Sequence, residues 1–386
     1  MTECRAYRRS LGLIELVSLG VGGTIGSGIF VVPGVAARLS GPWSLLAWAI
    51  VAISASCVLL SLASVSSRFA SGNSFLSLFE SVFGTRVAIP LIILYIISSI
   101  FGVSTIAAGI GQYISFFDLS SILYIEIVLI ASFCLINIIG ISFSGMTENI
   151  LTMLKIVPLI AISLLLMPYI RMENFATTLP LTTSGLLATI VIVYWPFTGF
   201  EISAIPVEES RDPTLIRRSL LIVMGIVVTI YLILNIALIG SVGAESLAAS
   251  PAPIATAAGT LFAQSGTLVA FIGIVAMLSA LNAYIIGTSR VLHSISGRLH
   301  LPKLNDLSGR GIPAYALAAG CSASAALLLF SNHFEALATI SVITTLIPYI
   351  FFCGASWILV TDAKSRLVSA VGGLSTLAIL VIYFIV

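Results

Sequence analysis

Long, uninterrupted apolar runs constrain the fold of this chain more than any other feature. The stretches 87–117, 144–168 and 220–242 contain almost no charged residues, and a helix needs about 20 mostly apolar residues to cross a bilayer. Hydrophobic residues make up 59% of the chain and charged residues 8%, against roughly 25% charged residues in soluble domains. A transmembrane barrel would show short strands of alternating polarity instead. The sequence therefore predicts an all-α integral membrane protein.

Apolar runs bounded by charge, glycine or proline predict eleven transmembrane helices. The expected ranges are 12–36, 43–68, 87–117, 121–141, 144–169, 185–207, 214–242, 261–292, 312–330, 336–360 and 367–386.

Basic residues are unevenly shared between the two sides of this arrangement. With the amino terminus in the cytoplasm, fourteen of the seventeen Lys and Arg residues fall on the cytoplasmic side. Arg38 and Arg171 fall outside, and Lys155 lies within a span. This asymmetry follows the positive-inside rule. An odd number of spans then places the carboxyl terminus outside the cell.

The sequence carries no signature of an enzyme, a metal site or a nucleic-acid interface. The five cysteines are odd in number and far apart, so we interpret them as packing residues. The cytoplasmic segments contain no His/Cys/carboxylate cluster, nucleophile motif or nucleotide-binding loop. We therefore expect no catalysis, no cofactor or metal and no nucleic-acid partner. The basic amino-terminal segment lacks a small-residue cleavage site and is expected to be a retained cytoplasmic tail.

A glycine-rich stretch, LGVGGTIGSGIF at 19–30, interrupts the first expected helix. Five of its twelve residues are glycine, and each weakens a helix by roughly 1 kcal/mol relative to alanine. An unwound backbone here would expose amides at 25–28 to a carboxylate and carbonyls at 22–24 to an ammonium group or cation. Such backbone is tolerated at membrane depth where it lines a cavity or is buried in protein. Close helix packing through Gly22 and Gly26, spaced as in GxxxG, is the alternative.

A second interruption, YWPFTGFE at 194–201, falls in the sixth expected helix. Pro196 and Gly199 break the helical pattern, and Trp195 and Thr198 are candidates for contacting a substrate. The alternative is a proline-kinked helix with packed aromatic side chains. Matched broken helices at corresponding positions of two halves indicate an inverted-repeat secondary transporter. We therefore expect one transporter domain over 1–386, with a first repeat at 12–169, a second at 185–360 and an additional helix at 367–386.

Ionisable residues inside the apolar spans are rare and hence informative. Lys155 lies roughly 11 residues, or about 16 Å, from the start of its helix, where a cation costs at least ~2.5 kcal/mol. We expect it to face the protein interior with a partner, either to bind and release a proton or as a purely structural pair. Glu201 follows the second break and could recognise substrate, pair with another group or stay protonated. Glu126 and Glu148 lie nearer helix ends and are expected to be interfacial.

An ordered set of motifs extends over essentially the whole chain and resembles the amino acid, polyamine and organocation transporter family. The motifs are GVGGTIGSGIFVVPG, SGPWSLLAW, WPFTGFE followed by EESRDP, and LNAYIIGTSRVLHSISGRLHLPK. The resemblance implies a leucine-transporter-like fold of five plus five inverted helices with discontinuous helices 1 and 6. The chain departs from the family in its helix count, because many members have twelve helices.

The resemblance also implies roles for particular residues. Together with the exposed backbone at the first break, it makes the candidate substrate site Gly23, Thr24, Ile25, Gly26, Ser27, Gly28, Trp195, Thr198, Phe200 and Glu201. Lys155, Ser279 and Gly20 form the second candidate site. There Lys155 would couple a proton, or its amine would occupy the position at which sodium binds in sodium-coupled relatives.

These observations predict a sodium-independent secondary transporter of amino acids that works by alternating access in a prokaryotic plasma membrane. It would act as a proton symporter or as an exchanger, without an obligate partner subunit. Thr198 and Glu201 leave a polar or cationic substrate open. The alternatives are a membrane amino-acid sensor that does not transport, and a transporter of polyamines or other organocations.

Overall fold

The computed structural model is all-α over the residues that it describes. These are residues 11–385, except for 67–73, 118–120, 140–144, 177–181, 205–209, 213, 263 and 310. The side chains of residues 74 and 145–148 also lie outside the description. The expected interfacial position of Glu148 therefore falls outside the described side chains. The helices are α1 (Leu13–Thr24), α2 (Ser27–Ser40), α3 (Ser44–Ser66), α4 (Ser74–Phe83), α5 (Thr85–Ser115), α6 (Ile122–Ile139), α7 (Gly145–Leu166), α8 (Thr183–Val193), α9 (Thr214–Ala248), α10 (Pro253–Ala258), α11 (Ser265–Ser296), α12 (Ala314–Phe330), α13 (Phe334–Leu359) and α14 (Ala363–Ile385).

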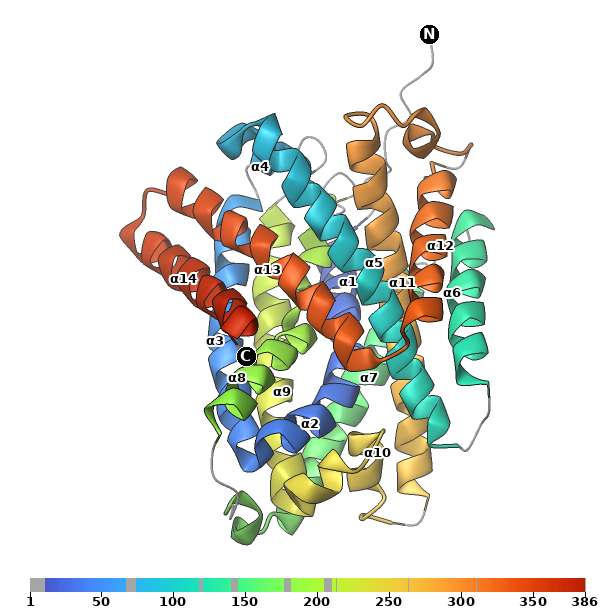
Figure 1. The fold of residues 1–386 in the computed structure, drawn as a ribbon, viewed down its shortest axis with the longest axis vertical. Helices are drawn as coiled ribbons and strands as arrows, with labels where there is room; N and C mark the ends of the chain where they lie inside the picture. The colour runs from blue at the N-terminus through green and yellow to red at the C-terminus, as the bar shows by residue number, and fades with distance from the viewer. Residues whose placement is uncertain are drawn as a thin grey trace.

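Nine helical segments within the described residues are long and apolar enough to cross a membrane. The first of them, Leu13–Ser66, has 54 residues, far more than the roughly 20 that one crossing needs. The chain descends through α1 and α2 and rises again through α3 (Figure 1), so this segment supplies two crossings. The shorter apolar helix α12 supplies one more. The described residues thus hold eleven apolar crossings, as the sequence predicts.

The structure differs from the expected helix ranges in several places. The second half of the first helix continues to Ser40 rather than 36, whereas the regular helix of the sixth span ends at Val193, just before the predicted interruption at 194–201. The sequence does not predict the short helix α4, because the charges on either side of it resemble loop sequence. Phe75 and Phe79 of α4 are buried against Phe352 of α13, with ring centroids 5.0 and 4.9 Å apart. This aromatic packing, rather than continuous hydrophobicity, defines the helix.

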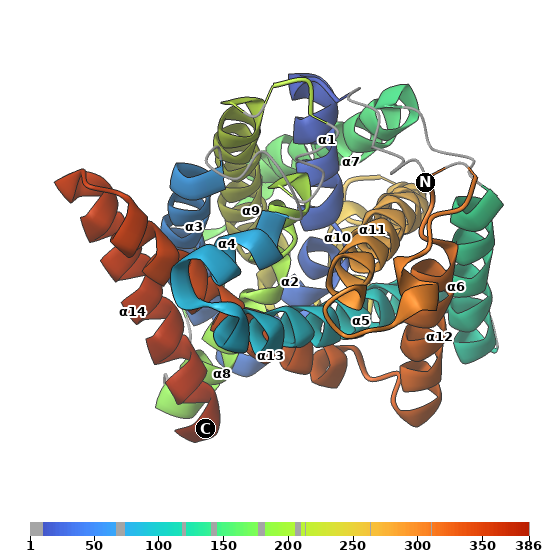
Figure 2. The ribbon, with the colours of Figure 1, turned by 90° about the horizontal axis from the view of Figure 1, so that it is seen from above.

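The broken helices lie in the interior of the bundle, and the outer helices shield them from lipid. Helix α14 lies at one edge and α6 at the opposite edge when the molecule is seen from above (Figure 2). Only 22% of the apolar window of α14 and 17% of that of α6 is buried, whereas 78% of the Thr183–Ala204 window is buried. Helix α9 packs against α1, α2 and α3, and α7 packs against α1. This arrangement places irregular backbone where protein, not lipid, surrounds it.

Candidate functional site

The first break separates α1 from α2 over two residues. Ile25 has φ −82° and ψ 88°, and Gly26 has φ −137° and ψ −145°. The Ile25 amide still donates to the Val21 carbonyl at 2.8 Å, and then the helix stops. Helix α2 restarts at Ser27, so the amides of its first turn have no carbonyl in the preceding turn to bond. The residues of this first turn are buried, so the positive end of the helix dipole lies inside the protein.

The second break is longer and tighter. Helix α8 is followed by the 3₁₀ helix η4 (Trp195–Phe197), the extended residue Thr198, Gly199 with φ +92°, and the 3₁₀ helix η5 (Phe200–Ala204). The positive φ strongly favours glycine, and so does the space around Gly199. A Cβ atom on Gly199 would lie 2.6 Å from the Gly23 carbonyl oxygen. The two breaks therefore touch each other, backbone to backbone.

The glycines of the first break support both interpretations of the sequence, an unwound backbone and close helix packing. A Cβ atom on Gly26 would lie 2.7 Å from the Cβ of Ala280 on α11, and one on Gly28 would lie 2.6 Å from the Cα of Pro196. The stretch is therefore a close-packing surface as well as an interruption of the helix.

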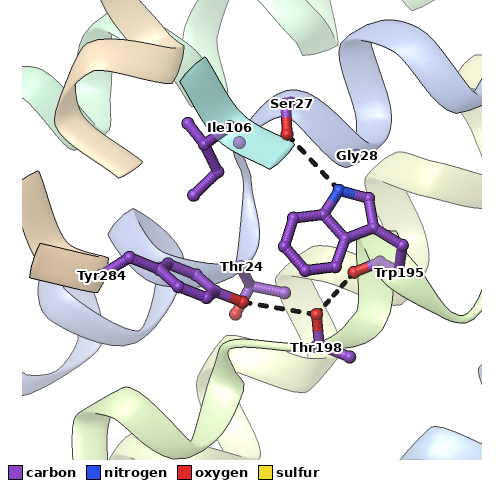
Figure 3. A pocket seen from close by; sticks show the side chains of 9 residues that line it. Thr24, Ser27, Gly28, Ile106, Trp195, Thr198 and Tyr284 are labelled. Carbon is purple, nitrogen blue, oxygen red and sulfur yellow. Dashed lines mark hydrogen bonds between the residues drawn. The ribbon is translucent and has the colours of Figure 1, made fainter. Parts of the chain in front are cut away.

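A small pocket lies between the two breaks. Its lining combines both broken segments with one residue each from α5 and α11: Gly23, Thr24, Gly26, Ser27, Gly28, Ile106, Trp195, Thr198 and Tyr284. Tyr284 and Ile106 face Trp195 across the pocket (Figure 3). Trp195 Nε1 donates to Ser27 Oγ over 3.4 Å, and the Thr198 and Tyr284 hydroxyls are 3.3 Å apart. None of the nine lining residues carries a charged side chain.

The structure brings together seven of the residues that the sequence singles out and adds two. Ile106 and Tyr284 line the pocket although the sequence does not single them out. Tyr284 carries a weak signal, since it is a tyrosine within the motif LNAYIIGTSR; Ile106 in an apolar helix carries none. Ile25 and Phe200 are not in the lining. Phe200 packs instead on the ring of Tyr349, with the centroids 5.3 Å apart.

Lys155 of α7 is fully buried against the first break. Its Nζ donates to the carbonyl oxygens of Gly22 at 3.0 Å and Ile25 at 3.3 Å. One turn earlier on α7, the Thr152 hydroxyl donates to the Ser18 carbonyl at 3.2 Å. These contacts satisfy backbone carbonyls near the interruption and fix α7 to α1.

Gly20 and Ser279 are buried but do not line the pocket. The Gly20 carbonyl accepts the Thr24 hydroxyl at 2.7 Å, and a Cβ atom on Gly20 would lie 2.7 Å from a methyl group of Val223 on α9. Gly20 thus allows α1 and α9 to approach closely. Ser279 lies on α11, the helix that also carries Tyr284 of the pocket lining.

Glu201 lies behind the second break rather than in the pocket lining. Its Oε2 accepts the Gly199 amide at 3.1 Å and the Tyr349 hydroxyl at 2.7 Å, and its Oε1 accepts the Tyr95 hydroxyl at 3.1 Å. All of these groups are buried. The carboxyl group therefore ties η5 to α5 and α13.

Glu126 differs from its expected interfacial position. It is 2% exposed and packs against Gly111 of α5, whose missing side chain leaves room for the carboxyl group. Its Oε2 has no hydrogen-bond partner among the described residues.

Comparison with known proteins agrees with this architecture. Residues 11–386 match the amino acid permease family. The inner membrane transport protein YbaT of Escherichia coli is 26% identical over 80% of this chain and 74% of its own length. The serine/threonine exchanger SteT of Bacillus subtilis is 26% identical over 95% of this chain and 86% of its own. The chloroplastic cationic amino acid transporter 9 of Arabidopsis thaliana is 27% identical over 76% of this chain and 57% of its own length. The chain therefore belongs to the amino acid permease family, within the amino acid, polyamine and organocation transporter superfamily.

Proposed function

We propose that this protein is a sodium-independent secondary transporter of neutral amino acids, working by alternating access in the plasma membrane. The observation that carries the proposal is the pocket between two interrupted helices, to whose lining both breaks contribute. Its polar backbone groups suit the carboxylate and ammonium groups that all amino acids share. The two five-helix halves, 12–169 and 185–360, would be the inverted repeats that move around this site.

The two charged groups of an amino acid have matching positions in this pocket. The amides of Ser27 and Gly28, at the start of α2, would take the carboxylate. The Gly23 carbonyl would take the ammonium group, because no N–H or O–H among the described residues donates to it. It suits this role better than the Trp195 carbonyl, which already accepts the Thr198 amide at 3.0 Å and hydroxyl at 2.7 Å.

The pocket lining favours a neutral substrate side chain. Ile106, Trp195 and Tyr284 offer apolar and aromatic surface, and no carboxylate is among the nine lining residues. A cationic amino acid or a polyamine would need such a partner once desolvated. Glu201 does not supply one, since three donors already bond it behind Gly199. The names of the relatives, which include a serine/threonine exchanger and a cationic amino acid transporter, do not choose between these classes.

Lys155 supports independence from sodium. Its amine occupies the carbonyl oxygens of Gly22 and Ile25, which are the hard oxygen ligands that a bound sodium ion would need. A cation at this position would have to displace the amine.

A substrate panel in liposomes tests the proposal. The purified protein should take up labelled alanine or serine, and neutral amino acids should compete while arginine, glutamate and putrescine do not. Replacing sodium by choline should leave uptake unchanged. Competition by arginine or putrescine alone would overturn the assignment of the substrate to neutral amino acids. Amino-acid binding without any uptake would favour the sensor alternative.

Coupling is tested in the same liposomes. Net uptake driven by a pH gradient identifies a proton symporter, whereas uptake that requires internal amino acid identifies an exchanger. If Lys155 couples the proton, Lys155→Ala should lose the response to the pH gradient, and Thr152→Val should keep it. The Thr152 variant is the matched control because it also removes a bond from α7 to α1 but no amine. An unchanged pH response in Lys155→Ala would restrict Lys155 to a structural role.

A further inference from the structure

A carboxyl group is enclosed between α5 and the peripheral helix α6, away from the pocket. Glu126 of α6 is 2% exposed, and its Oε2 is buried without a hydrogen-bond partner among the described residues. The carboxyl group occupies the space of a missing side chain, because a Cβ atom on Gly111 of α5 would lie 2.9 Å from its Cδ. Gly111 thus leaves a notch in α5 that accepts this carboxyl group.

The helices packed against α6 place no cation beside Glu126. They are α5, α11 and α12, and their basic residues are Arg86 at the start of α5 and Arg290 and His293 near the end of α11. The start of α5 and the end of α11 lie at the upper end in Figure 1, whereas Gly111 lies near the other end of α5. The remaining titratable groups of these three helices are neutral phenols and a thiol: Tyr95, Tyr113, Tyr284, Tyr315 and Cys321.

These surroundings suit a carboxylic acid better than a carboxylate. An ionised carboxyl group taken out of water needs a cation or several donors, and without them the neutral form is favoured. Glu201 has such donors, since three of them bond its two oxygens. No N–H or O–H among the described residues donates to Oε2 of Glu126.

Water is nevertheless close to this carboxyl group. Glu126 lies four residues after Ile122, the first residue of α6, which is about 6 Å along the helix axis. Ile122 covers the notch, because its methyl group would lie 2.7 Å from a Cβ atom on Gly111. A small separation of α5 from the start of α6 would therefore let the carboxyl group exchange its proton with the solution.

Helix α5 connects this contact to the pocket. Ile106 of α5 lines the pocket, and a Cβ atom on Gly109 would lie 2.6 Å from the Cβ of Ser27 at the start of α2. The same stretch of α5 therefore touches the first break through Gly109 and Glu126 through Gly111.

Resting on the transport function proposed above, we propose that Glu126 is an intramembrane proton-binding site that sets the position of α5 at the pocket. With the proton bound, the neutral carboxyl group fits the notch at Gly111 and α5 stays packed against Ser27. When the proton leaves to water, the carboxylate has to reach water at the end of α6, and the contact between α5 and α6 loosens. The protonated form therefore favours amino-acid binding.

Dicyclohexylcarbodiimide tests the proton directly, because it is soluble in lipid and reacts with protonated carboxyl groups. The carboxyl O–H adds across one C=N bond, and the product rearranges to a stable N-acylurea without oxidation or reduction. Helix α6 lies at the edge of the bundle (Figure 2), so the reagent can approach from lipid. At neutral pH, mass spectrometry of peptides should find the adduct on Glu126 and not on the exposed Glu173. The adduct at position 126 should be absent from Glu126→Gln.

The link to the pocket is tested by uptake at equal pH on both sides of the liposome membrane, so that no gradient drives transport. From about pH 5 to about pH 9, the range in which buried carboxyl groups lose their protons, the KM for the transported amino acid should rise severalfold. Glu126→Gln, which keeps the shape and stays neutral, should hold the low KM throughout. Glu173→Gln is the matched control, because it removes an exposed carboxylate and should keep the pH dependence.

The outcomes separate the two proposals. Absence of the adduct from Glu126, or an unchanged pH dependence of KM in Glu126→Gln, overturns the role of Glu126 and leaves the transport function standing. If the glutamine variant folds poorly, the unmodified protein decides: adduct formation should fall over the pH range in which KM rises, and a constant yield would overturn the proposal. A protein that forms the adduct but transports no amino acid overturns the transport function and leaves Glu126 as a proton-binding site.

Discussion

At the scale of single residues, Gly28 shows how one missing methyl group sets the geometry of the site. A Cβ atom there would lie 2.6 Å from the Cα and 3.0 Å from the amide nitrogen of Pro196. These are backbone atoms of the other break, so a side-chain rotation cannot relieve the clash. Gly28→Ala should therefore lower the free energy of unfolding by about 1 to 3 kcal/mol, as overpacking does, and abolish amino-acid uptake. Thermal unfolding in detergent and liposome uptake measure the two effects.

Gly225 of α9 offers the matched control for this substitution. A Cβ atom on Gly225 meets no atom within 4 Å. Gly225→Ala should leave uptake unchanged and stabilise the helix by up to about 1 kcal/mol, since alanine is the better helix former. Normal uptake by Gly28→Ala would show that the two breaks are not in tight contact in the working protein.

How far the site could be predicted depends on what distinguishes each residue. Glycine and proline mark the breaks directly, because they alter backbone propensity wherever the helix packs. Ile106 and Tyr284 could not be placed, because their helices are apolar on every side and the sequence does not show which side faces the pocket. The position of Glu201 depends on the positive φ of Gly199, which turns η5 away from the pocket.

At the scale of elements, the short helix η5 depends on Glu201 for its attachment to α5 and α13. Replacing the carboxyl group by an amide keeps one oxygen for Gly199 and Tyr349, and the amide nitrogen can donate to the Tyr95 hydroxyl. Glu201→Gln should therefore retain folding and binding within a few-fold. Glu201→Ala leaves buried donors unpaired, at about 1 to 3 kcal/mol each, and should unfold at a clearly lower temperature. Equal melting temperatures for the two variants would contradict this attachment.

The elements also show where apolar periodicity is informative and where it is not. Helices such as α5 and α13 are long and apolar, and their ranges agree with the expected ones to within a few residues. Helix α4 cannot be predicted in this way because its burial depends on a few aromatic contacts with α13. The ends of interrupted helices also deviate, because tertiary contacts between the breaks, rather than local propensity, decide where winding stops.

At the scale of the whole molecule, the distribution of charge gives the bundle two different ends. The starts of α5 and α9 and the end of α11 lie at the upper end in Figure 1, while the end of α2 and the short 3₁₀ helices after α7 (Met167–Tyr169 and Met172–Phe175) lie at the lower end. An ion pair joins Arg298 to Glu80 at 3.1 Å, and another joins Arg38 to Glu335 at 2.5 Å. The first pair belongs to the end with most of the basic residues, which the positive-inside rule assigns to the cytoplasm.

This orientation can be tested by labelling single cysteines on opposite ends. Lys303 and Glu173 are both exposed, and we expect Lys303 to face the cytoplasm and Glu173 the outside. In intact cells a membrane-impermeant maleimide should therefore label Glu173→Cys and not Lys303→Cys, and it should label both after permeabilisation. Replacing Cys4 removes one source of background, while Cys134, Cys321 and Cys353 are buried and Cys57 is half-buried. Labelling of Lys303→Cys alone in intact cells would mean that the basic end faces outward.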